Sequence, residues 1–257
     1  MVAITNQQAR PSRHFAGSFI AYALVAVEVA VALGLGRLAW WWVMGMVLVA
    51  LIELRGLRER GAQWFWSRLP GLVVALSVVM IVALAPRFIT QVGVAGLFGL
   101  WLVWRERQGA DGPLSLVQLL IVQAVMFEAI FLAAAIWRVP ALVTLILVWV
   151  GAYLTVYGAL TLRKDRSAGV MAASWGVIAT EVAWILSQWL ITYTMNGGYI
   201  LVPQPALILT ALAYVYGSIL ASSRQGNLSR GRLGEYLLIG AVLVLIVVVG
   251  TSWRGNV

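Results

Sequence analysis

The stretch LLIVQAVMFEAIFLAAAIWRVP, residues 119–140, decides the class of this protein. It is longer than the run of about 18 apolar residues that a helix needs to cross the roughly 30 Å hydrocarbon layer of a bilayer. It also holds a glutamate, Glu128, near its middle. The stretch therefore predicts a transmembrane helix with a carboxyl group at a depth where a charged side chain is costly.

Similar apolar runs recur along the whole chain. The 257 residues are 62% hydrophobic and only 11% charged, whereas soluble domains carry about 25% charged residues. We therefore predict an all-α, polytopic integral membrane protein, with residues 1–257 in a single membrane domain. Hydropathy predicts about nine spans, at 16–36, 38–54, 69–86, 88–104, 114–137, 139–162, 168–194, 200–221 and 233–252. The first run is longer than a signal-peptide core of about 7–15 residues, so we expect it to be a retained helix.

The basic residues sort by side of the membrane. If the N-terminus is cytoplasmic, fourteen of the 18 lysines and arginines fall on the cytoplasmic side. The opposite side then holds Arg37, Arg87, Arg138 and Arg254. This asymmetry predicts a cytoplasmic N-terminus and a C-terminus on the other side of an inner or plasma membrane of prokaryotic type. The net charge of +9 is then topological, and it indicates the lipid bilayer, not nucleic acid, as a partner.

The chain also carries signs of an internal repeat. Arg37, Arg87 and Arg138 are 50 and 51 residues apart, and EVAVAL (28–33), FEAIFL (127–132) and EVAWIL (181–186) resemble one another. We predict four tandem parallel helical hairpins, followed by a ninth helix at 230–253. The hairpins cover 16–61, 65–109, 114–166 and 168–224. Parallel repeats occur in transporters, with sites at the repeat interface; the alternative is that duplication only enlarged the bundle.

Three glutamates occupy equivalent places in these hairpins. Glu28 and Glu128 lie nine and ten residues before an outer arginine, and Glu181 has the corresponding position in the fourth hairpin. At 1.5 Å per residue, each carboxyl lies about 13–15 Å below the outer boundary. No basic residue shares this depth, and an ionised carboxylate facing lipid is unfavourable. We therefore expect the three acids to converge on the interior of the bundle near the membrane midplane.

Further polar side chains extend this predicted interior. Ser174, Glu181 and Gln188 are seven residues apart, so they form one stripe along the seventh span. Tyr157 and Tyr216, at equivalent places in the sixth and eighth spans, add hydroxyl groups. These residues predict a polar pathway for a proton or cation. The alternative is that the hydroxyls and amides only join helices, as such groups commonly do in membranes.

The residue inventory excludes several classes of site. The chain has no cysteine, a single histidine (His14) in its polar leader and a single lysine (Lys164) in a charged loop. We therefore expect no resident cofactor, no metal site and no recognisable catalytic constellation. The sequence favours a small channel or transporter that moves a proton or cation, or a small solute coupled to one. A non-catalytic accessory subunit of a larger membrane complex is the alternative. Other membrane subunits and further copies of the chain both remain open as partners.

Overall fold

The structure is a computed structural model, and it describes residues 62–85, 88–107, 115–188, 191–195 and 200–249. All of these residues belong to one compact unit, Glu53–Val257. The first two predicted spans, 16–36 and 38–54, and with them Glu28, lie outside the described residues.

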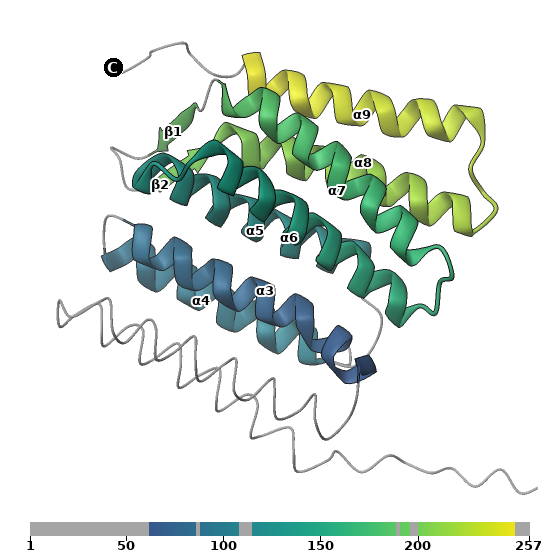
Figure 1. Cartoon of the computed structure of the whole chain (residues 1–257), viewed down its shortest axis with the longest axis horizontal. Coiled ribbons are helices and arrows are strands. Elements are labelled where there is room, and N and C mark those ends of the chain that lie inside the picture. Colours follow the sequence, from purple (N-terminus) through teal and green to yellow (C-terminus); the bar gives the residue numbers. More distant parts are fainter. Residues whose placement is uncertain (1–61, 86–87, 108–114, 189–190, 196–199, 250–257) are drawn as a thin grey trace, which may run out of the picture. The chain divides into compact units, whose positions relative to one another are not determined.

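The described part of the chain is almost entirely helical (Figure 1). Its seven helices are α3 (Ala62–Leu84), α4 (Phe88–Arg107), α5 (Leu116–Trp137), α6 (Ala141–Leu162), α7 (Ala168–Ser187), α8 (Gln204–Arg224) and α9 (Arg230–Val249). Five of them, α5 to α9, are long and apolar enough to cross a membrane, and α3 contains a shorter apolar stretch, Leu69–Leu84. The prediction of a helical membrane protein is thus confirmed. The total of nine spans and the hairpin repeat remain predictions.

Local sequence signals explain where these helices begin and end. At the start of α5, the Ser115 hydroxyl accepts a hydrogen bond from the Gln118 backbone N–H at 3.2 Å, and the Gln118 side chain accepts one from the Ser115 N–H at 2.9 Å. This capping box satisfies two backbone donors that the first turn would otherwise leave unpaired. At the other end, Arg138 adopts the left-handed conformation (φ 51°), which terminates the helix.

A short β-hairpin separates α7 from α8 and corrects the predicted spans. Residues Thr192–Met195 (β1) and Ile200–Pro203 (β2) pair as antiparallel strands. The predicted seventh span, 168–194, is therefore too long, because α7 ends at Ser187. The predicted eighth span, 200–221, begins too early, because α8 starts at Gln204. Pro203 is the N-cap of α8, and Pro205 lies in its first turn. Proline is favoured in the first turn because the backbone N–H that it lacks has no helical acceptor there.

The helices pack around α5 and α6. The most extensive contact between two helices is that of α6 with α7, and α5 packs against α3, α6 and α8. Aromatic side chains from two helices, Phe127, Phe131 and Trp175, are fully buried in this core, together with small residues such as Ala152 and Ala179. Small side chains allow membrane helices to approach closely, and dispersion contacts then stabilise the packing.

Helix α9 lies at the edge of this unit. It packs on α8, and Gly240 is its only buried residue in the described part of the helix. A Cβ atom added at Gly240 would collide with the Val215 side chain of α8, so the two helices touch backbone to side chain at this point. The rest of α9 exposes leucine and valine side chains, as expected for a helix that faces lipid.

Candidate functional site

A cavity of about 400 Å³ lies between α3, α4 and α5. Each helix contributes four lining positions with the same spacing of four, three and four residues, which keeps them on one face of a helix. Residues 74, 78, 81 and 85 come from α3 and the residue after it, 90, 94, 97 and 101 from α4, and 121, 125, 128 and 132 from α5. Leu84, Phe98 and Leu201 of β2 complete the lining.

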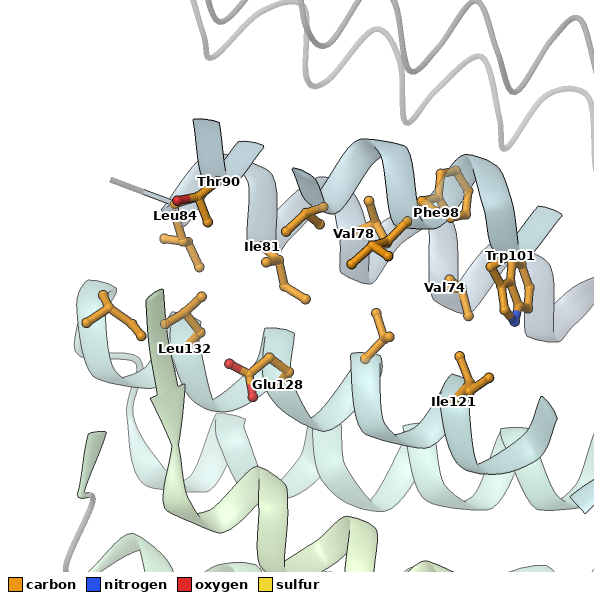
Figure 2. A pocket seen from close by; sticks show the side chains of 15 residues that line it. Val74, Val78, Ile81, Leu84, Thr90, Phe98, Trp101, Ile121, Glu128 and Leu132 are labelled. Carbon is orange, nitrogen blue, oxygen red and sulfur yellow. The ribbon is translucent and has the colours of Figure 1, made fainter. Parts of the chain in front are cut away.

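The cavity is apolar except at a few positions. Among its lining residues only Thr90, Trp101 and Glu128 carry a polar side-chain atom, and only Glu128 carries a charge. Figure 2 shows the Glu128 side chain on α5, with its carboxyl directed along the helix toward the side where Leu132 lies. In the part of the chain that the structure describes, no hydrogen bond or ion pair is assigned to this carboxyl. In the series of four lining positions on each helix, the third is Ile81 on α3 and Leu97 on α4. On α5 the third position is the acid Glu128.

The two ends of the cavity differ. At one end, Leu84 and Leu132 are buried in one cluster and Leu201 packs on them; Leu84 and Leu132 lie on the Glu128 side of the cavity (Figure 2). At the other end lie the rings of Phe98 and Trp101, which stack with their centroids 6.2 Å apart. The cavity therefore has a carboxyl toward one end and an aromatic wall toward the other.

One residue of the cavity lining is strongly exposed. Leu97 is 68% exposed, and it lies at the middle of α4. If α4 crosses the bilayer, as the apolar run 88–104 predicts, this part of the lining lies at the depth of the acyl chains.

No family model matches the chain, and neither the curated proteins nor the solved structures give a match. The function is therefore inferred from the chemistry of the site.

The expected convergence of the glutamates is wrong for Glu128 and Glu181. Glu128 lines the cavity, whereas Glu181 is exposed on the outer face of α7 and does not reach it. The rest of its stripe, Ser174 and Gln188, is exposed as well. The seven-residue spacing correctly put the three residues on one face, but that face points away from the other helices. The reason is that α7 buries its opposite face, with Ala172, Trp175 and Ala179, against α6.

The hydroxyl groups of α6, α7 and α8 do not line this cavity. Most hydroxyl groups bond to their own helix: Ser174 donates to the Val170 carbonyl at 2.9 Å, and Thr180 to the Gly176 carbonyl at 2.7 Å. Thr210 does the same with Ala206. Because these bonds satisfy the hydroxyls locally, none of them is directed into the cavity.

The two tyrosines of the predicted pathway join helices. The Tyr216 hydroxyl donates a hydrogen bond of 2.7 Å to the Met171 carbonyl of α7, and its ring stacks on Trp175. Tyr157 stacks on Tyr153 and meets the Trp66 ring of α3 edge to face at 4.7 Å. Neither tyrosine lines the cavity.

One polar contact in the core also joins helices. The Gln123 amide of α5 donates to the Thr155 hydroxyl of α6 at 3.2 Å, and both side chains are fully buried. Thr155 in turn donates to backbone carbonyls of its own helix. The sequence did not predict this contact, because its two partners are 32 residues apart and lie on different helices.

A charged cluster lies at the end of the helices where α6 meets α7. Asp165 accepts two hydrogen bonds of 2.7 Å from the hydroxyl and the backbone N–H of Ser167, and it forms an ion pair with Arg224 at the end of α8. The Ser167 hydrogen bonds, more than the arginine, hold the pKa of the Asp165 carboxyl below its ordinary value of 3.8. The cluster connects the α6–α7 turn to the C-terminal end of α8.

Proposed function

We propose that the protein is a small membrane transporter or channel in which Glu128 binds a proton or a cation. One observation carries the proposal: a cavity between three helices has a single charged group, a carboxyl near the centre of its helix. Glu128 lies 12 residues after the start of α5 and nine before its end, which at 1.5 Å per residue is about 18 Å and 14 Å.

The cost of this carboxyl supports a role for it. Charged residues at a helix centre cost about 2.5–3.5 kcal/mol on membrane-insertion scales, and leucine at the same place is favourable. Every other member of the α5 stripe, Ile121, Val125 and Leu132, is apolar. An ionisable side chain kept inside a membrane is by default a candidate for a substrate or proton pathway.

Flux across proteoliposomes tests this proposal. Purified protein is reconstituted with a pH-sensitive dye inside the vesicles, and proton entry is followed after a potassium gradient sets the membrane potential. We expect Glu128→Gln to reduce the flux at least about tenfold, because the amide cannot release a proton or neutralise a cation. Glu181→Gln is the matched control, since it removes another carboxyl of the membrane region that lies outside the cavity. Equal flux in wild type and Glu128→Gln would refute the proposal.

A second function, an accessory subunit of a larger complex, is favoured by a different observation. Ser174, Glu181 and Gln188 are exposed on the outer face of α7, and no other helix in the described part of the chain covers them. An acid on a lipid-facing surface is unfavourable unless another helix covers it. If this reading holds, Glu181→Gln reduces the yield of the native assembly, measured by its mass after mild extraction, and leaves permeability unchanged. An assembly of unchanged mass and yield would refute it.

We also propose that the N-terminus is cytoplasmic and the C-terminus is on the other side, in an inner or plasma membrane of prokaryotic type. The charges support this orientation. The α6–α7 turn, with Arg163 and Lys164, and the α8–α9 turn lie at the same end of the helices, whereas Arg138 lies at the opposite end (Figure 1). Protease accessibility of a C-terminal tag in sealed vesicles tests the orientation.

A further inference from the structure

The residues that line the cavity restrict the class of ligand that it can bind. None of its lining residues is basic, so the cavity offers nothing to neutralise an anion. Only two lining side chains, Thr90 and Glu128, carry oxygen atoms. A bare metal cation of the calcium type needs about six or more oxygen ligands. An organic cation does not need a shell of oxygen ligands, because its charge is spread over several atoms of the molecule. A single carboxylate is enough to neutralise it.

The length of the cavity indicates the shape of a ligand that would fit it. Glu128 and Ile121 are seven residues apart on the same face of α5, so about 10 Å separate the two levels of the cavity. Figure 2 shows Trp101 at the level of Ile121, away from Glu128. A ligand with its charge near Glu128 therefore has room for an apolar body that extends toward Phe98 and Trp101. Aromatic faces attract both apolar groups and cations.

The depth of the cavity supports a lipophilic ligand. Leu97, an exposed residue of the lining, lies at the middle of α4. If α4 spans the membrane, as its apolar run predicts, this level is that of the acyl chains and not of water. A cation that partitions into the bilayer reaches this level directly, whereas a hydrated ion would have to shed its water in the lipid.

We propose that the cavity binds a lipophilic monovalent organic cation, with its charge beside Glu128 and its apolar body against Phe98 and Trp101. This inference rests on the proposed function only for the transport of the ligand, because binding can occur without transport. The volume of about 400 Å³ is within the range of about 300–1,000 Å³ for small-molecule sites.

A pair of ions of the same shape and opposite charge tests the inference. Binding of tetraphenylphosphonium and of tetraphenylborate to the purified full-length protein is measured by equilibrium dialysis. We expect wild type to bind the phosphonium and to bind the borate at least about tenfold more weakly. Glu128→Gln should weaken phosphonium binding at least about tenfold, and Phe98→Leu about three- to tenfold through the lost ring contact. Glu181→Gln should bind as wild type does.

Unfolding midpoints of all variants show whether lost binding is a loss of fold. If Glu128→Gln unfolds early, Phe98→Leu and the choice between the two ions still test the inference. Equal binding of both ions, or phosphonium binding that does not depend on Glu128 and Phe98, would overturn it, because the cavity would then be an unselective apolar pocket.

The binding and flux experiments separate the two proposals. Glu128-dependent proton flux without phosphonium binding would refute the lipophilic ligand and support the proposed function. Glu128-dependent phosphonium binding in a protein that moves neither protons nor the phosphonium across the vesicle membrane would support the ligand and refute the transport role.

Discussion

If Glu128 serves a ligand and not the fold, its replacement by leucine should stabilise the protein. On insertion scales a charged residue at a helix centre costs about 2.5–3.5 kcal/mol and leucine gains about 0.3–0.6 kcal/mol, so the difference is at most about 3–4 kcal/mol. Glu128 is only half-buried, and the wall of its cavity is exposed at Leu97. Part of the penalty is therefore relieved by hydration, and we expect Glu128→Leu to raise the free energy of unfolding by about 1–2 kcal/mol.

Thermal unfolding in mixed lipid–detergent micelles measures this gain. For a chain of this size, about 1–2 kcal/mol corresponds to a rise in Tm of about 2–8 °C. Glu128→Gln is the matched comparison: it removes the charge but keeps a polar amide, so its gain should be below about 1 kcal/mol. Both variants should lose flux while they keep or gain stability.

The opposite sign would refute this reasoning. If Glu128→Leu lowers the free energy of unfolding by more than about 1 kcal/mol, then the carboxyl makes a native interaction that holds the helices together. Glu128 would then be a structural residue, and neither the transport proposal nor the ligand proposal would have its main support.

Three further predictions concern the fold. Thr155→Val should cost about 0.5–2 kcal/mol, because it leaves the buried Gln123 amide without its acceptor; Gln123→Leu in the Thr155→Val background should recover most of this loss in chemical denaturation. Gly240→Ala should destabilise by about 1–3 kcal/mol through its collision with α8, whereas Gly234→Ala, on the same helix with open space around it, should be neutral or gain up to about 1 kcal/mol. The lowered pKa of Asp165 stabilises the fold above its ordinary value of 3.8 and the effect is lost as the pH falls through the lowered pKa; Asp165→Asn should therefore flatten the acid side of a plot of Tm against pH, and an unchanged slope would contradict this origin.

Hydropathy and helix signals predicted the helices well but not their ends. The apolar runs at 114–137 and 139–162 coincide with α5 and α6 to within two residues, because lipid leaves the backbone few alternatives to a helix. Helix α3 starts at Ala62, seven residues before the predicted span, since a helix can continue beyond its apolar part and through Pro70. The β-hairpin was missed because TYTM and ILVP carry no charged residue and directly adjoin the apolar runs of α7 and α8.

The site was predicted only in part, for a geometric reason. A sequence period shows which residues share a face, but not whether that face points to the interior or to lipid. Glu128 and Glu181 therefore looked equivalent, although one lines the cavity and the other is exposed. The lining residues Phe98 and Trp101 of α4 were not singled out. Trp101 could have been found from the spacing of four, three and four residues that the cavity faces of three helices share, whereas Phe98 lies outside this spacing.

The absence of cysteine from the chain permits the most direct test of the central claim, that the Glu128 carboxyl draws a cation into the cavity. A single cysteine is introduced at Val125, in the cavity wall, and in a separate variant at Ile178, on the exposed face of α7. The rate of alkylation by N-ethylmaleimide is measured with and without tetraphenylphosphonium. We predict that the phosphonium slows labelling of Val125→Cys but not of Ile178→Cys, and that Glu128→Gln abolishes this protection. Labelling of Val125→Cys that the phosphonium leaves unchanged, or protection that persists without the carboxyl, would contradict the account.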